Sequence, residues 1–198
     1  MNNSIQLKLI ATHLLAQREE NPARSNFPKE LVLDSTDDAI EVQKLMIYLN
    51  DQTVYGWKCM LPLDDGSIIL APLLHAPIKQ AENCPLYTTN NKALIEPEIA
   101  FILQSDLPSN KTYTNEDVDT AFASAHLALE LIQKRFDEDT PSTHIEKLAD
   151  GLSNQGVYLG PQIDKAKAYN ASTVNINVKQ TELELNLAGV HPAELAQL

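Results

Sequence analysis

The sequence predicts an α+β fold in which N-terminal helices pack on a mixed, mainly antiparallel sheet. Apolar residues recur at helical spacing near the N-terminus, and from residue 54 onward short apolar segments alternate with turn signals. Two denser apolar runs, at residues 93–103 and 127–132, predict buried strands. We expect a single domain over residues 1–198, with a helical part at 1–52 and a sheet-rich core at 53–198 that holds the candidate site.

Two amphipathic helices are expected before the sheet. The first covers residues 5–18 and ends before Pro22, and its apolar side chains recur at helical spacing: Ile5, Leu9, Ala11, Leu14, Leu15 and Ala16. Asp34, Ser35 and Thr36 are N-cap candidates for the second helix. The apolar face expected for that helix comprises Ala39, Ile40, Val42, Gln43, Leu45, Met46 and Leu49.

The remaining elements follow from short local patterns. Strands are expected at residues 54–61 and 67–74, joined by a turn at 64–66. Thr114 and Asp117 have the spacing of a capping box, so a third helix should begin there and run through Ala125. The later elements are expected in this order: strands at 93–103 and 127–132 flanking that helix, a helical turn at 144–148, and strands at 156–159, 174–178 and 183–187.

Two carboxylates interrupt the apolar run at residues 93–103. Because side chains on a strand alternate between faces, Glu96 and Glu98 share one face and Pro97 lies on the other. Carboxylates on such a strand are costly unless they are paired or bound to a cation, and Mg²⁺, Mn²⁺ and Ca²⁺ prefer oxygen ligands. Pro97 lacks a backbone donor, which favours an edge strand or a bulge. The alternative is a solvated edge strand with two exposed glutamates.

A third carboxylate, Glu130, interrupts the apolar run at 127–132. Alone, it fits either the exposed end of a helix or a ligand. Together with Glu96 and Glu98 it would supply a third oxygen ligand from a different strand, leaving positions on the cation for water and a chelating substrate. We therefore expect the three carboxylates to converge on one cation site.

Charge and composition exclude several classes of function. The formal net charge of -12 repels the phosphate backbone, so nucleic acid is not an expected partner. Apolar runs are too short to span a membrane, and the N-terminus lacks the pattern of a signal peptide, so we expect a cytoplasmic protein with no membrane partner. Two cysteines are too few for a disulfide framework.

Five segments occur in an order that is typical of one superfamily. They are residues 94–101 with 106–108, the strand Gly56-Trp57-Lys58, residues 129–132 with Arg135, the loop at 149–153 and the turn at 189–192. Together they resemble the fumarylacetoacetate hydrolase superfamily, and within it the branch of 2-keto-4-pentenoate hydratase and 4-oxalocrotonate decarboxylase. The resemblance spans most of the chain, from the second helix to the C-terminus.

The resemblance implies a barrel-like core and a metal-dependent lyase, a hydratase or decarboxylase of small 2-oxo or 2-hydroxydienoic acids such as those of aromatic catabolism. It assigns Glu96, Glu98 and Glu130 to Mg²⁺ or Mn²⁺. It assigns Lys58 to acid/base chemistry near an enolate, which the cation stabilises, and Ser153 to the substrate carboxylate. Without the resemblance, Lys58 also fits an ordinary outward-facing strand lysine.

The chain departs from the family pattern at several points. Cys59-Met60-Leu61-Pro62 replaces Gly-Leu-Thr/Ser, Gln133-Lys134 replaces Asp-Ser, and Gly151 stands where asparagine is usual. The loop before residue 93 is short, and the chain ends soon after His191-Pro192. We therefore expect an incomplete barrel with an exposed sheet edge near 183–187, which a homo-oligomer would cover.

Two other functions stay open beside the lyase. A degenerate, non-catalytic member would keep the fold as a binding or assembly subunit, consistent with the altered pocket segments. An acylpyruvase-type hydrolase ranks lower, because Glu130 stands where that branch has an aspartate.

Overall fold

The computed structural model describes these residues: 3–18, 25–50, 53–60, 66, 68–79, 84, 86–89, 92–137, 142–171 and 184–187. The chain divides into two compact units. The first unit combines Met1–Ala76 with Ile132–Gly156, and the second combines Pro77–Leu131 with Val157–Leu198. The organisation into a single domain stays a prediction.

Among its described residues, the first unit contains three helices and a two-stranded antiparallel hairpin: α1 (Asn3–Ala16), α2 (Thr36–Leu49), α4 (His144–Ala149), β1 (Gly56–Cys59) and β2 (Leu70–Leu73). All five elements were predicted from the sequence, and the structure confirms them. Ser35 is the N-cap of α2, where its hydroxyl accepts a hydrogen bond from the backbone N–H of Asp38 at 3.1 Å. Thr143 and Glu146 form a capping box that starts α4.

The apolar face of α1 differs from the one that the sequence predicted. Its buried residues follow the spacing i, i+3, i+4, i+7: Leu7, Ile10, Ala11 and Leu14. Ile5 and Leu9 were expected on this face, yet they are 56% and 45% exposed. Each precedes a buried residue by two positions, which turns it by about 200° around the helix axis and away from the core.

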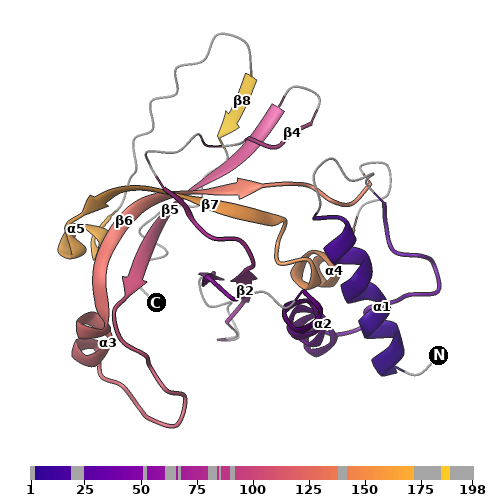
Figure 1. Cartoon of the computed structure of the whole chain (residues 1–198), viewed down its shortest axis with the longest axis horizontal. Coiled ribbons are helices and arrows are strands. Elements are labelled where there is room, and N and C mark those ends of the chain that lie inside the picture. The colour runs from indigo at the N-terminus through magenta and orange to yellow at the C-terminus, as the bar shows by residue number, and fades with distance from the viewer. Residues whose placement is uncertain are drawn as a thin grey trace. The chain divides into compact units, whose positions relative to one another are not determined.

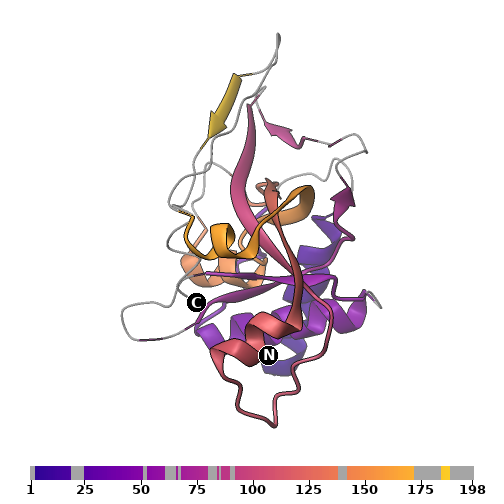
Figure 2. The ribbon, with the colours of Figure 1, turned by 90° about the vertical axis from the view of Figure 1, so that its left-hand side faces the viewer.

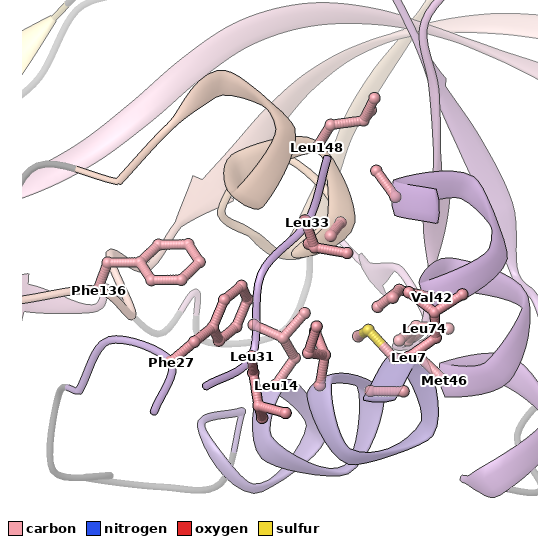
Figure 3. Close-up of a cluster of buried hydrophobic side chains, with 14 of the residues drawn as sticks. Leu7, Leu14, Phe27, Leu31, Leu33, Val42, Met46, Leu74, Phe136 and Leu148 are labelled. Atoms are coloured by element: carbon pink, nitrogen blue, oxygen red, sulfur yellow. The ribbon is translucent and has the colours of Figure 1, made fainter. Parts of the chain in front are cut away.

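The core of the first unit joins both N-terminal helices to segments much later in the chain. Figure 3 shows leucines of α1 and Met46 of α2 packed with Leu148 of α4 and with Phe136. Phe27 packs edge-to-face on Phe136, with ring centroids 5.5 Å apart. These contacts hold residues 132–156 in the same compact unit as the N-terminus.

The second unit is built on a six-stranded sheet with the order β3-β7-β6-β5-β4, in which β8 also pairs with β5. Its elements are β3 (Ile78–Lys79), β4 (Thr88–Thr89), β5 (Lys92–Leu103), α3 (Asn115–Ala121), β6 (Phe122–Ile132), β7 (Asn154–Ile163), α5 (Lys165–Tyr169) and β8 (Glu184–Leu187), with the ends of β6 and β7 reaching into the first unit. Figure 1 shows β5, β6 and β7 running alongside one another, with β4 and β8 beside one end of β5.

The sheet is mixed and open. β4 pairs antiparallel with β5, whereas β3 with β7 and β8 with β5 are parallel pairs. Within the described strands no pairing closes the sheet into a barrel, so the predicted α+β class is confirmed without a closed barrel. The pairs of β5 with β4 and β8 involve Lys92–Ile95, so Pro97 lies beyond both ladders, where its missing N–H costs neither of them a hydrogen bond.

The chain changes from helix to strand earlier than predicted. Thr114 and Asp117 do form the capping box of α3, but the helix ends at Ala121 and not at Ala125. Phe122 takes an extended conformation and packs on Phe101 of β5, with ring centroids 4.9 Å apart. Figure 2 shows α3 at the base of β6, where the helix gives way to the strand. Packing against β5 therefore overrides the helical spacing of residues 122–125.

Three short elements, β3, β4 and α5, were not predicted, because each is too short to carry a periodic pattern. Predicted features at residues 174–178 and 189–192, and most of the turn at 64–66, lie outside the described residues. None of the described helices is long and apolar enough to cross a membrane.

One polar cluster joins both short helices of the second unit to its sheet. The Tyr169 ring stacks on Phe101 at 5.2 Å, and its hydroxyl donates a hydrogen bond to the carboxylate of Asp119 at 2.8 Å. The Lys165 ammonium lies 3.2 Å from the same carboxylate and donates to the carbonyl of Phe122 at 3.2 Å. Burial, with the hydrogen bond to Asp119, raises the pKa of Tyr169 to about 12.

This cluster predicts a loss of stability at high pH. Because the pKa of Tyr169 is higher in the folded chain than in the unfolded one, its contribution is complete below pH 10 and is lost as pH rises toward about 12. We expect Tyr169→Phe to flatten this part of the stability curve. Urea unfolding of both proteins at a series of alkaline pH values measures the difference, and identical curves would show that Tyr169 does not contribute.

Candidate metal centre

Three glutamates of the second unit bring their carboxylates together. Glu96 and Glu98 lie two residues apart on β5 and so share a face, and Glu130 lies on the neighbouring strand β6. One carboxylate oxygen from each residue lies within 4.8 Å of the others. The structure therefore confirms that the three carboxylates converge, as the sequence predicted. The binding of a cation stays a prediction.

Burial separates the three glutamates into two kinds. Glu130 is 2% exposed, between the buried Ala128 and Leu131 of the same strand, whereas Glu96 and Glu98 are half-buried. Two alternatives from the sequence are thus wrong: Glu130 is not at the exposed end of a helix, and Glu96 and Glu98 are not fully exposed. Glu96 and Glu98, both on β5, are thus the two members of the cluster that are partly exposed to solvent.

The spacing of these oxygens fits a hard cation. Oxygens that bind one ion can be no further apart than twice the metal–oxygen distance, about 4.2 Å for Mg²⁺ and about 4.8 Å for Ca²⁺. The upper limit of 4.8 Å therefore places the three oxygens near the range in which they could share one hard cation. Two ionised carboxylates 4.8 Å apart repel by roughly 3.5 kcal/mol at an effective dielectric constant of about 20. A positive charge at the centre would remove that cost.

Lys58, predicted as the acid/base residue, lies in the first unit on β1. It is half-buried and pairs across the hairpin with Ala71, whereas its neighbours Trp57 and Cys59 are exposed on the opposite face. Ala71 is fully buried and lies next to the turn at Gly151, because a Cβ added to Gly151 would be 3.8 Å from the Cβ of Ala71. Lys58 therefore belongs to the face of the hairpin that packs on this turn. Its orientation toward the carboxylates stays a prediction.

Ser153, predicted to meet the substrate carboxylate, closes an unusual turn after α4. Gly151, Leu152 and Ser153 have φ values of 76°, 58° and 65° in succession. Glycine adopts this left-handed conformation freely, but leucine and serine each pay about 1–2 kcal/mol for it. Such strain persists only where surrounding contacts hold the backbone, and it often marks functional segments.

A buried ionic network lies directly beside this turn. Arg135 is 1% exposed, and its Nε donates a hydrogen bond to the fully buried Asp150 carboxylate at 2.7 Å, while Nη1 donates to Gln155 Oε1 at 2.7 Å. Arg18, which follows α1, reaches the same place and donates to the carbonyl of Asn154 at 2.8 Å. Burial, then the charges of Arg18 and Arg135, lower the pKa of His75 nearby.

Sequence reasoning found only part of this network. Arg135 and Asp150 stand in segments that carry the family resemblance, but Arg18 was not singled out. In the predicted helix at 5–18, Arg18 stands in the last turn, where an arginine is ordinarily solvated near the negative end of the helix dipole, so no local pattern indicates its burial. Its partners are more than 130 positions away in the chain.

Comparisons with known proteins show the fold. The chain matches no family model and no curated protein. It is similar to the solved structure of 4-oxalocrotonate decarboxylase from Pseudomonas putida G7 complexed with magnesium and adipate, with 15% identity and a TM-score of 0.61 over 85% of this chain and 68% of that one. The same enzyme complexed with calcium and acetate gives 15% identity and a TM-score of 0.57 over 85% and 67%.

Proposed function

We propose that the protein is a metal-dependent lyase, a hydratase or decarboxylase, of small 2-oxo or 2-hydroxydienoic acids. The observation that carries this proposal is the convergence of Glu96, Glu98 and Glu130 within 4.8 Å on a fold similar to 4-oxalocrotonate decarboxylase. The solved relatives hold magnesium or calcium together with a carboxylic acid, which supports the same pairing of ligands here. The incomplete barrel of this superfamily is part of the same proposal.

The three glutamates would hold Mg²⁺ or Mn²⁺, since all their donor atoms are oxygens of the type that these ions prefer. When bound, the cation supplies positive charge next to the oxygen on which an enolate develops. The half-buried Glu96 and Glu98 leave the cluster accessible to an acid from solution, and Glu130 fixes it to the buried side of the sheet. Ser153 would hold the substrate carboxylate.

Lys58 would move the proton, and its removal tests that role. We expect Lys58→Ala to lower kcat by roughly 10²–10⁴-fold, the usual contribution of a general acid or base, and to change Mg²⁺ affinity much less. Lys44→Ala, which removes an exposed lysine of α2, is the matched control. Steady-state kinetics and a Mg²⁺ titration of each variant measure both effects. Unchanged turnover in Lys58→Ala would show that this lysine has no role in catalysis.

The proposed activity is tested with a small panel of 2-oxo and 2-hydroxydienoic acids. Loss of their ultraviolet absorbance reports hydration or decarboxylation, and CO₂ release separates the two. We expect turnover with Mg²⁺ or Mn²⁺ and none with EDTA. Absence of turnover with the panel, at metal concentrations that saturate the site, would contradict the proposal.

The alternative is a non-catalytic member that keeps the fold as a binding or assembly subunit. Gly151 favours it, because this residue stands where the family pattern has a polar asparagine in the loop of Ser153. The homo-oligomer expected from the sequence would fit either function. Metal binding without turnover, together with an oligomer in light scattering, would favour the alternative.

A further inference from the structure

Two buried arginines of the first unit contact the same two residues. Asp150 and Asn154 flank the left-handed turn, and both Arg18 and Arg135 donate hydrogen bonds to each of them. We propose that Arg18 and Arg135 are positioning residues that hold this turn, and with it Ser153, in the conformation that receives a substrate carboxylate. The inference rests on the proposed function, since it gives Ser153 a substrate to meet.

The contacts span the turn from both sides. At the start of the turn, Arg18 Nη2 donates to the carbonyl oxygen of Asp150, and Arg135 Nε donates to the Asp150 carboxylate at 2.7 Å. At the end of the turn, Arg18 Nη1 and Arg135 Nη2 donate to the carbonyl oxygen of Asn154 at 2.8 and 2.9 Å. Two rigid guanidinium groups thus fix the separation of the two ends between which Ser153 lies.

Backbone hydrogen bonds close this segment in two successive turns. The N–H groups of Gly151 and Leu152 bond to the carbonyls of Leu148 and Lys147 at 2.9 and 2.8 Å, which is the Schellman pattern at the end of a helix. That motif needs one left-handed residue, and glycine supplies it. The N–H of Asn154 then bonds to the carbonyl of Gly151 at 3.1 Å, which closes a second turn over the left-handed Leu152 and Ser153. The two arginines add side-chain contacts at both ends of this turn, whose non-glycine residues are strained.

This network buries more charged groups than are needed to hold a turn in place. Two guanidinium groups with side chains 5% and 0% exposed share one carboxylate, that of Asp150, which is also fully buried. Burying a charge costs several kcal/mol unless it is well paired, so a turn could be held at lower cost by neutral groups. Burial and the Arg135 charge lower the pKa of Arg18 to about 9. A net positive charge beside Ser153 is the arrangement that would attract an anionic substrate.

Arg18 also explains the glycine in this loop. A Cβ at position 151 would lie 3.1 Å from Arg18 Nη2, so any larger side chain would compete with the guanidinium for the same space. The departure from the family pattern at Gly151 is therefore matched by an arginine that enters from the end of α1.

A cysteine introduced at position 153 tests whether Arg18 and Arg135 hold the turn, and this test does not require enzymatic activity. In a background with Cys59→Ser and Cys84→Ser, which removes the free cysteines, Ser153→Cys is labelled with a disulfide reagent such as dithionitrobenzoate. We expect Arg18→Lys and Arg135→Lys, which keep the charge but lose the two-sided contact, to change the labelling rate roughly fivefold or more. Lys44→Ala, which removes an exposed cation of α2, should leave the rate unchanged.

Kinetics of the same lysine variants, with Ser153 intact, separate positioning from general stability. If the wild-type protein is active, we expect KM for the 2-oxo acid to rise with kcat nearly unchanged, since a displaced Ser153 weakens substrate binding. An unchanged labelling rate, or a changed rate with unchanged KM, overturns the inference. If the wild-type protein has no turnover, the proposed function fails, and the labelling still decides whether the arginines hold the turn. Arg18→Met replaces Arg18→Lys should the lysine variant not fold.

Discussion

Glu130→Gln is expected to abolish the rise in melting temperature that Mg²⁺ gives the wild-type protein. A cation that binds only the native chain stabilises it, and the gain grows with the ratio of metal concentration to Kd. The amide keeps the shape of the side chain but removes the buried carboxylate of the cluster, whose oxygen lies within 4.8 Å of those of Glu96 and Glu98. Loss of a ligand should weaken binding by more than the roughly 10–100-fold that follows loss of an outer contact.

Glu116→Gln is the matched control for that experiment, because it makes the same chemical change at an exposed position of α3. Differential scanning fluorimetry across a range of Mg²⁺ concentrations measures both variants beside the wild type. The control should keep the full metal-dependent shift. Equal shifts in Glu130→Gln and the wild type would show that the cation, if it binds, is held elsewhere.

Arg135→Ala is expected to have the largest effect on stability, about 3–5 kcal/mol of unfolding free energy, which is typical of breaking a buried ion pair from one side. The substitution leaves the Asp150 carboxylate fully buried, with the Arg18 Nη2 atom 3.8 Å away as its remaining ion-pair contact among those described. It also removes the donor to Gln155 Oε1. Urea unfolding measures the loss.

Lys134→Ala provides the control for this experiment, since it removes a neighbouring exposed cation and should change stability by no more than about 0.5 kcal/mol. Combining Arg135→Ala with Asp150→Asn should cost less than the sum of the two single changes, because the Arg135–Asp150 ion pair can be lost only once. Additive effects would contradict a direct interaction between Arg135 and Asp150.

The sequence predicted the candidate metal centre better than it predicted its surroundings. Alternation along a strand places Glu96 and Glu98 on one face whatever the strand packs against, so their pairing follows from local geometry. Glu130 could be added because a lone carboxylate in a dense apolar run stands out from its neighbours. Local patterns do not determine the order of strands in a sheet, so they could not show that the strand of Glu130 lies beside the strand of Glu96 and Glu98. The family resemblance predicted that the three residues share one site.

Tertiary contacts explain the features that the sequence did not predict. Residues 122–125 have helical spacing, but packing of Phe122 on Phe101 draws them into β6. Ile5 and Leu9 look like core residues of α1, but the helix turns a different stripe inward. Arg18 looks like a surface arginine, and only the return of residues 150–155 to the first unit buries it. For Phe122 and for Arg18, a residue distant in the chain decides the outcome.

The central claim is that Glu96, Glu98 and Glu130 hold a cation to which a 2-oxo acid binds, and one calorimetric titration tests it most directly. Oxalate, an unreactive dianion with the same chelating pair of oxygens, is titrated into the protein with and without saturating Mg²⁺, and the heat of oxalate mixing with Mg²⁺ alone is subtracted. We predict that oxalate binds only when Mg²⁺ is present and tightens Mg²⁺ binding by the same factor, as thermodynamic linkage requires. Oxalate binding of equal strength with and without Mg²⁺ would contradict the account.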